Sequence, residues 1–402
     1  MLEKTKVDKL STITLGMLTA FGPFLTDFYL PFLPELSRYF NTSPAVATVS
    51  LTAGMIGLAV GQIFIGPLSD RYGRRKLLII SMAGFIVSTV LCLLAPDIAV
   101  FNFCRLLQGL TGAGGVVLAK SVATDLFTGK PLADFLALLG AINGVAPVAA
   151  PVVGGVLSKF TTWRGVFVVL LFLGIILLLL CMRLKETLAP DKRSKGGLLP
   201  AYANLFKVFK NPRFSLSTIA NMCSFFTFFA YIAASPFIFQ SVYHLSAFQY
   251  SICLGLNALF IVVGTMLTTK FHHNNTALKW AALDLLASAL LVGLAQIFHA
   301  PLAVMMPCYI YMLISFGMMQ PVSTAIAMDS ERNNAGAASA MFGASSFVAG
   351  AMVSPVVTIG NVLVSASIVM VGGALLCTVY TLPLCNKVKH EQMQANSKEE
   401  HR

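Results

Sequence analysis

Three long stretches without charge constrain the fold of this chain most strongly. No Asp, Glu, Lys or Arg occurs in residues 214–269, 285–328 or 333–386. A helix that spans a bilayer needs about 20 apolar residues, so each stretch is long enough for two helices and a short turn. Only 11% of the 402 residues are charged, against roughly 25% in an ordinary soluble domain. The second half therefore predicts six membrane helices in three hairpins.

The first half divides into six further apolar spans. Within hydrocarbon the backbone must satisfy its own hydrogen bonds, which only helices and closed barrels achieve. These spans are too continuously apolar for barrel strands, whose residues alternate. We therefore predict an all-α membrane protein with twelve transmembrane helices in two pseudo-symmetric six-helix bundles. The expected spans of the first half are residues 10–34, 45–69, 77–95, 98–119, 135–158 and 165–182.

The basic residues indicate membrane topology rather than a nucleic-acid partner, although the net charge is +12. With the N-terminus inside and twelve spans, 24 of the 28 bases fall on the inner side. Arg38, Lys159 and Arg164 fall outside, and Arg105 lies within a span. Because Lys and Arg accumulate on the cytoplasmic side of membrane proteins, both termini are expected in the cytoplasm.

Polar intervals suggest the domain boundaries. We expect an N-terminal bundle at 1–182, a cytoplasmic linker at 183–213, a C-terminal bundle at 214–384 and a loosely ordered cytoplasmic tail at 385–402. An amphipathic piece near 198–209 is expected to lie on the membrane surface. The halves also share Pro and Gly interruptions in their first and fifth spans, which in transporters indicate a substrate site between the repeats.

Several segments resemble one transporter family. The sequence GPLSDRYGRRK at 66–76 resembles the loop signature of the major facilitator superfamily, and FCRLLQGLTGAGG and APVAAPVVGG are similar to its antiporter motifs. TDFYLPFLP and FAYIAASPFIF resemble the bicyclomycin-resistance (Bcr/CflA) branch of drug/proton antiporters. The resemblance implies proton-coupled efflux of small, mostly apolar drugs or metabolites across the bacterial cytoplasmic membrane by alternating access. The alternative is a secondary transporter of one metabolite, either an exporter or a symport importer.

Two ionisable side chains within spans are candidates for proton coupling. An ionised Asp27 in the first span costs several kcal/mol, so a carboxyl that binds a proton on one side and releases it on the other can couple transport. Arg105 keeps its charge and must face the bundle interior, a carboxylate or carbonyls. It could interact with Asp27 or with substrate, or tune a nearby acid. The resemblance to an RxxQG motif implies that Arg105 and Gln108 take part in coupling. The alternatives are an Asp27 that meets water at a helix end and an Arg105 that ties helices together.

The charged stretch at 66–76 is the candidate for cytoplasmic gating. Gly73 permits a tight turn, and Asp125 at the end of the fourth span could pair with Arg74 or Arg75. Topology alone requires bases but no acid, so Asp70 argues for a specific role. The resemblance implies a gating latch, for which the second-half counterpart TTKFHHNNTALK has lost the pattern. The expected latch residues are Gly66, Asp70, Arg71, Gly73, Arg74, Arg75 and Asp125.

The fifth span and the second half supply further candidates. Proline bends a helix and glycine allows helices to approach closely, so the antiporter motif is assigned to Pro147, Pro151, Gly154 and Gly155. The alternative is a kinked helix without a special role. Polar groups within spans suggest substrate-cavity residues, namely Asn143, Tyr231, Ser235 and Gln320.

Other function classes find no support in the sequence. It contains no G-x-x-x-x-G-K-[ST] phosphate loop, no nucleophile triad and no metal-ligand spacing. We therefore expect neither an enzyme nor a bound cofactor or metal. The expected partners are a small-molecule substrate, protons and the lipid bilayer, without nucleic acid, and the chain is expected to be a monomer.

Overall fold

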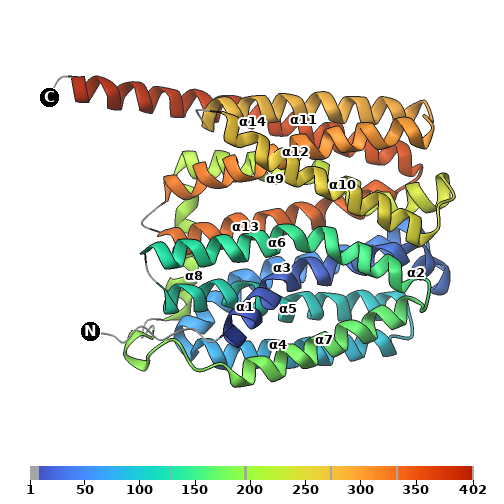
Figure 1. Cartoon of the computed structure of the whole chain (residues 1–402), viewed down its shortest axis with the longest axis horizontal. Coiled ribbons are helices and arrows are strands. Elements are labelled where there is room, and N and C mark those ends of the chain that lie inside the picture. Colours follow the sequence, from blue (N-terminus) through green and yellow to red (C-terminus); the bar gives the residue numbers. More distant parts are fainter. Residues whose placement is uncertain (1–8, 128, 194–196, 272–273, 332–333, 401–402) are drawn as a thin grey trace. The chain divides into compact units, whose positions relative to one another are not determined.

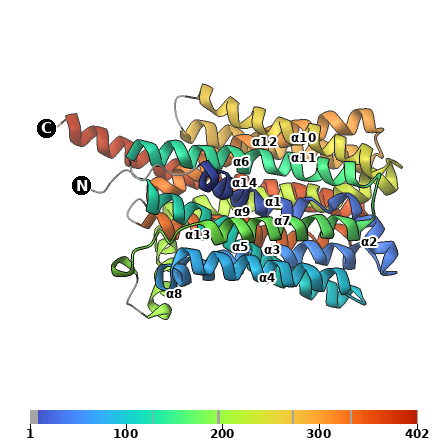
Figure 2. The ribbon, with the colours of Figure 1, turned by 60° about the horizontal axis from the view of Figure 1, so that its bottom comes forward.

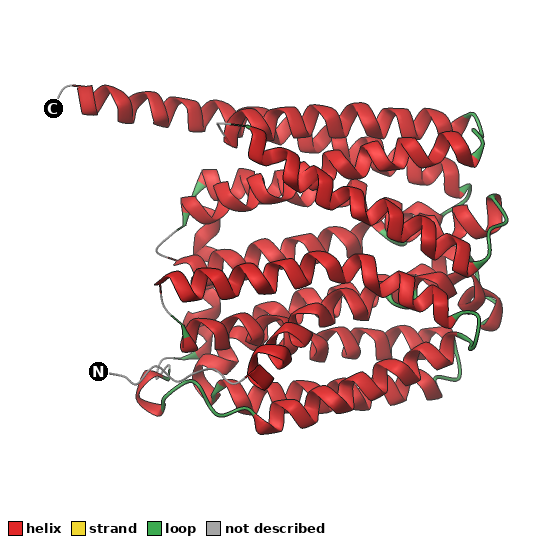
Figure 3. Cartoon of the chain, in the orientation of Figure 1, coloured by secondary structure: helices red, strands yellow, loops and turns green. Residues whose placement is uncertain are grey.

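The computed structural model describes residues 9–127, 129–193, 197–271, 274–331 and 334–400. Every regular element in these residues is helical, and no strand occurs among them (Figure 3). Contacts divide the chain into two compact units. Unit 1 contains Met1–Ala203 and His244–Gly255, and unit 2 contains Asn204–Tyr243 and Leu256–Arg402. The change from unit 1 to unit 2 after Ala203 falls within the predicted linker.

Unit 1 is built from long helices that run side by side (Figure 1). The first span ends early at Asp27 and continues through a short 3-10 turn into a second short helix. A further short helix, α8, forms where the amphipathic piece is predicted. The elements are α1 (Lys9–Asp27), η1 (Leu30–Phe32), α2 (Leu33–Tyr39), α3 (Pro44–Tyr72), α4 (Arg74–Leu94), α5 (Ile98–Leu126), α6 (Gly129–Leu157), α7 (Trp163–Arg183) and the first part of α8 (Leu198–Lys207), which continues into unit 2 after Ala203.

Unit 2 contains the remaining long helices. The helix α9 carries Pro236 near its end and continues into a π-helical turn, Ile238–Val242. The helix α10 begins in the segment that groups with unit 1. The long helices are α9 (Pro212–Phe237), α10 (Ala247–Leu267), α11 (Asn274–Ile297), α12 (Leu302–Ser330), α13 (Ala335–Val353) and α14 (Val362–Glu400).

The membrane prediction is confirmed by the lengths of these helices. Eleven segments of the described chain are long and apolar enough to cross a bilayer. The helix α6 has 29 residues and contributes a shorter apolar stretch, Val145–Leu157. Together they match the predicted spans, so the all-α membrane class holds.

The predicted loop at 66–76 is almost entirely helical, which differs from the expectation of a turn of several residues. The helix α3 continues to Tyr72 and α4 begins at Arg74, so Gly73 alone connects them. Gly73 has a φ of +97°, which side-chain-bearing residues rarely adopt. A Cβ atom there would also lie 2.4 Å from Oε2 of Glu186. One glycine therefore replaces a loop and leaves Asp70 and Arg74 on adjoining helix ends.

Glycines bring α3 and α5 into direct backbone contact. A Cβ atom on Gly57 would lie 2.2 Å from the carbonyl oxygen of Leu106, and one on Gly109 would lie 2.1 Å from that of Gly54. Only glycine permits such an approach. This contact seats Arg105 in the interior of unit 1.

The predicted loosely ordered tail is instead a continuation of α14. This helix passes Pro383 and extends to Glu400. The residues beyond 385 include Glu, Gln, Lys and Ala, which favour helix. The polar composition therefore marks where the membrane span ends, but the helix itself continues beyond that point.

Candidate functional site

Arg105 lies at the end of α1, although it belongs to α5. Its side chain is fully buried, with 0% exposure. Nη2 donates to the carbonyl oxygen of Leu25 at 2.9 Å, and the guanidinium lies 4.5 Å from the centre of the Tyr29 ring. The last carbonyls of a helix lack partners within the helix and carry partial negative charge. The cation of Arg105 therefore satisfies the C-terminal end of α1.

Gln108 extends this contact to α4. Nη1 of Arg105 donates to Oε1 of Gln108, and Nε2 of Gln108 donates to the hydroxyl of Thr89 at 2.7 Å. The hydroxyls of Tyr29 and Ser50 are hydrogen-bonded at 3.0 Å, which adds α3. Arg105 and Gln108, the two residues that the resemblance assigns to coupling, thus lie in contact within a polar network that joins four helices.

Asp27 is the last residue of α1 and lies at the same helix end. It is 8% exposed and has a side-chain hydrogen bond with Thr26. No ion pair joins Asp27 to Arg105 in the part of the chain that the structure describes. Of the partners considered from sequence, Arg105 therefore takes carbonyl and amide oxygens in this conformation.

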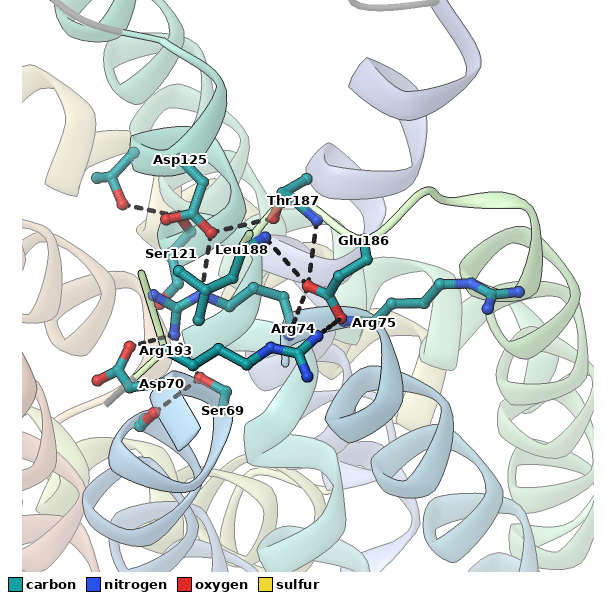
Figure 4. Close-up of polar contacts among 12 residues, drawn as sticks. Ser69, Asp70, Arg74, Arg75, Ser121, Asp125, Glu186, Thr187, Leu188 and Arg193 are labelled. Carbon is teal, nitrogen blue, oxygen red and sulfur yellow. Dashed lines mark hydrogen bonds and ion pairs between the residues drawn. The ribbon is translucent and has the colours of Figure 1, made fainter. Parts of the chain in front are cut away.

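The charged residues around Gly73 form a second site, shown in Figure 4. Arg74 binds two carboxylates, with Nη1 2.6 Å from Oδ1 of Asp70 and Nε 3.0 Å from Oδ2 of Asp125. Nη1 also donates to the Ser69 hydroxyl at 2.5 Å. The pairing expected between Asp125 and Arg74 or Arg75 is found with Arg74. The ends of α3, α4 and α5 are thereby held together.

Sequence reasoning missed Glu186, which follows α7. Its Oε1 accepts the backbone N–H of Arg74 at 2.9 Å, and its Oε2 accepts that of Arg75 at 3.3 Å. These are the first N–H groups of α4, which lack helical partners and favour an anion. Thr187 also donates to Oδ2 of Asp125 at 3.0 Å. We call Asp70, Arg74, Asp125 and Glu186 the junction cluster.

Glu186 shares with Asp70 the sequence signal that distinguished Asp70. Both are acids beside bases at the inner end of a predicted span, where topology requires no acid. Glu186 sits directly after Lys185 in the predicted linker. What the sequence could not show is that the start of α4, more than a hundred residues earlier, lies against it.

The other predicted latch residues lie apart from the ion pairs. Arg75 turns to α7, where Nη2 donates to the carbonyl oxygen of Met182 at 2.8 Å. Arg71 is exposed, and its guanidinium lies 5.6 Å from the Tyr72 ring. Gly66 has ordinary contacts, since a Cβ atom there would lie 3.8 Å from Val117.

The fifth-span motif lies beside the end of α1. Pro147 and Pro151 are inside α6, and Gly154 and Gly155 are both buried. A Cβ atom on Gly154 would lie 2.1 Å from the carbonyl oxygen of Phe28. The motif therefore places the α6 backbone against the turn that follows Asp27.

The predicted cavity residues of unit 2 belong to neutral polar networks. Tyr231 is buried, and its hydroxyl accepts Nδ2 of Asn257 at 2.8 Å. The Ser235 hydroxyl donates to the carbonyl oxygen of Ile232 at 3.1 Å. Gln320 is half-buried and lies 3.4 Å from the Ser224 hydroxyl. The side chain of Asn143 lies outside the described residues.

A second network in unit 2 was not predicted. The rings of Tyr231 and Tyr309 are 4.9 Å apart. Nε2 of Gln296 donates to the Tyr309 hydroxyl at 2.6 Å, and the Ser367 hydroxyl donates to Oε1 of Gln296 at 2.5 Å. Together with Asn257 these side chains form the tyrosine–glutamine network, which joins five helices. Polar residues within apolar spans were its signal, the same one that selected Asn143 and Gln320.

Curated relatives share long stretches of this sequence. An uncharacterized MFS-type transporter, YdgK, of Bacillus subtilis is 36% identical over 354 residues, which cover 86% of this chain and 88% of the relative. A bicyclomycin resistance protein homolog of Haemophilus influenzae is 28% identical over 64% of this chain and 65% of its own length. The multidrug resistance protein MdtL of Salmonella typhimurium is 30% identical over 58% of each chain.

Solved structures share the fold. The crystal structure of a D-xylose–proton symporter has a TM-score of 0.73 at 16% identity, over 93% of this chain and 96% of that one. The human organic anion transporter MFSD10 has a TM-score of 0.64 at 19% identity, over 94% and 96%. The family model of the Major Facilitator Superfamily matches residues 15–355. This chain is therefore a multi-pass membrane transporter of small molecules, and it belongs to the major facilitator superfamily.

Proposed function

We propose that this chain exports small, mostly apolar drugs or metabolites across the bacterial cytoplasmic membrane in exchange for protons. It acts as a monomer by alternating access, with both termini in the cytoplasm. Relatives named for bicyclomycin and multidrug resistance support this assignment. The defining property of such an exporter is that a proton gradient drives the substrate outward.

The observation that carries the proposal is the buried charge at the end of α1. Arg105 is enclosed by the Leu25 carbonyl, Gln108 and the Tyr29 ring. Because Arg stays protonated, a permanent positive charge lies at the helix end that also bears Asp27. Protonation removes the negative charge of Asp27 and leaves this fixed cation, so the local electrostatics differ between the two states of the carboxyl. Such a difference is what proton coupling requires.

The junction cluster is the proposed gating element. Arg74 and Glu186 hold the starts and ends of α3, α4, α5 and α7 at one place. Each contact depends on helix-end geometry, so a change of conformation that shifts one helix end breaks several of them together. Gly73 joins α3 to α4 beside the cluster, and Arg75 links the start of α4 to the end of α7. Gly66 in α3 and the exposed Arg71 complete the proposed gating residues.

Three of the four proposed substrate groups belong to unit 2, and Asn143 belongs to unit 1. Tyr231, Ser235 and Gln320 are neutral, as is Asn143 in α6. Aromatic and amide groups suit a largely apolar molecule with few hydrogen-bonding groups. The helix α6, with Pro147, Pro151, Gly154 and Gly155, lies against the turn after Asp27 and is the proposed mechanical link to the proton site.

The test is transport into and out of proteoliposomes with an imposed pH gradient. We expect gradient-driven movement of an apolar drug in exchange for protons, and its loss in Asp27→Asn. The matched control is Asp97→Asn, because Asp97 caps α5 by accepting the N–H of Val100 at 2.9 Å and Asn caps equally well. Movement of substrate with the proton, in the same direction, would instead favour the symport importer. Full coupling in Asp27→Asn would reject the proton site.

A further inference from the structure

A surface pocket in unit 1 lies beside the junction cluster and is not explained by transport. Its volume is about 460 Å³. Three bases line it, Arg75, Lys76 and Arg193, together with the Glu186 carboxylate. The remaining wall is apolar and aromatic, formed by Tyr72, Ile79 and Ile80. The pocket thus combines a basic side and an apolar side.

The basic side has capacity for an anion. The Glu186 carboxylate is already engaged, because the N–H groups of Arg74, Arg75, Thr187 and Leu188 all donate to it. Arg193 lies 3.8 Å from Glu186, and its Nε has no hydrogen-bond partner among the described residues. A guanidinium held by one long ion pair retains donors for another acceptor.

The basic side also keeps donors at Arg75 and Lys76. Arg75 uses one of its N–H groups on the Met182 carbonyl, and a guanidinium has five. Lys76 is exposed at the rim. The pocket therefore contains three cations and a single carboxylate, that of Glu186, which already accepts hydrogen bonds from backbone N–H groups. The excess positive charge favours a bound anion.

The apolar side continues along the membrane-facing surface of α4. Ile80 is 54% exposed, and Val87, Leu91 and Leu94 follow on the same helix face with exposed side chains. This helix is a membrane span that begins at Arg74, and it lies at the edge of unit 1 in both views (Figures 1 and 2). The first turn of a membrane helix meets the headgroup region, where bases contact lipid phosphates. The pocket therefore opens where the hydrocarbon region begins.

We propose that this pocket binds the headgroup of an anionic phospholipid. The phosphate lies among Arg75, Lys76 and Arg193, and an acyl chain follows Ile80 along α4. Free inorganic phosphate offers the same charge but leaves the apolar wall uncovered, so the lipid fits both sides. The inference requires only a membrane protein and is independent of proton coupling.

The test uses full-length protein in detergent, with lipid binding measured by native mass spectrometry. Dioleoyl-phosphatidylglycerol is titrated against dioleoyl-phosphatidylcholine, and inorganic phosphate forms a third arm. We expect preferential binding of phosphatidylglycerol and about fivefold weaker binding in Lys76→Gln, the effect of one base near an anionic surface. Ile80→Gln should also weaken the binding of phosphatidylglycerol, because it removes part of the apolar wall, but it should leave the binding of inorganic phosphate unchanged.

The control removes a base outside the pocket. Lys185→Gln makes the same charge change at an exposed residue that does not line the pocket, and its lipid binding should match the wild type. Equal binding of the two lipids would overturn the proposal. Equal weakening in Lys185→Gln would show general charge attraction, and displacement of the lipid by millimolar phosphate would show a simple anion site. Either result also overturns it.

Discussion

The interiors of the two units differ in the kind of polarity they bury. Among the described residues, the buried charged side chains are Asp27, Arg74 and Arg105, and all three belong to unit 1. In unit 2 the buried polar groups are amides, phenols and hydroxyls, as in the tyrosine–glutamine network. A neutral network can be satisfied completely by hydrogen bonds, whereas a buried charge is costly unless it is used. The contrast agrees with the proposed function, in which unit 1 carries the proton-coupling residues and unit 2 carries most of the substrate residues.

The helix ends show the same contrast. In unit 1 the junction cluster joins α3, α4, α5 and the residues after α7. In unit 2 Arg213 lies 3.1 Å from Asp329, and Asn211 donates to Glu331 at 3.0 Å, which ties α9 to the end of α12. The second half thus has an ion pair at its helix ends, but between different elements.

The largest effect should come from Arg105. In Arg105→Met we expect loss of gradient-driven transport with a change in unfolding free energy within about 1 kcal/mol, because a buried charge without an ionic partner costs stability itself. Gln296→Met in unit 2 should instead lower stability and leave transport intact. It removes the hydrogen bonds that Gln296 makes with the hydroxyls of Tyr309 and Ser367 and should cost about 2 kcal/mol, while transport stays coupled. Proteoliposome transport and thermal unfolding in detergent measure both. If Arg105→Met still transports substrate in exchange for protons, the proposed coupling role of the buried charge in unit 1 is wrong.

The second-largest effect, a loss of stability, should come from replacing Gly73. We expect Gly73→Ala to lower stability by about 2 kcal/mol because of its φ of +97° and the contact with Glu186. The control is Gly360→Ala in unit 2, where φ is +68° and no atom lies within 4 Å of the added Cβ. That change should cost about 1 kcal/mol. If thermal unfolding shows the same loss of stability in both variants, the contact between residue 73 and Glu186 adds no cost beyond the positive φ.

Glu186 should matter more than its counterpart at the other unit's helix ends. In Glu186→Gln we expect slower transport and a loss of about 1 kcal/mol, since the anion at the start of α4 is lost. Glu331 accepts the side-chain amides of Asn211 and Asn334. Glu331→Gln keeps an oxygen acceptor at this partly exposed site and should change stability by less than about 0.5 kcal/mol. Initial transport rates and melting temperatures separate the two. A slower Glu331→Gln with a normal Glu186→Gln would reverse the assignment of the gate.

The smallest effect should come from Tyr231. Removing its hydroxyl in Tyr231→Phe leaves Nδ2 of Asn257 without this acceptor and should cost about 1 kcal/mol. If unit 2 recognises substrate, the KM for drug efflux shifts while the proton-to-substrate coupling is retained. The measurement is drug transport at several concentrations with parallel recording of proton movement. A change in coupling with an unchanged KM would place the proton pathway in unit 2 as well.

Much of the architecture could be predicted from sequence because membrane helices obey local rules. Charge-free stretches set the spans, and bases clustered at 66–76 marked one helix-pair connection. The residue types at this connection were also predictable, including a pair between Asp125 and either Arg74 or Arg75, which the structure forms with Arg74. The length of that connection was not, since only the φ of Gly73 and the continued helices reduce it to one residue.

The amino-acid sequence by itself determined that this chain lies in a membrane as paired helices and that Asp27 and Arg105 are exceptional within spans. Only the tertiary structure decided what meets them. Arg105 reaches the Leu25 carbonyl because glycines press α5 against α3, and Glu186 reaches α4 because α7 ends beside it. Composition and periodicity act over neighbouring residues, whereas these contacts join residues 80 and 112 positions apart and exist only once helices have packed.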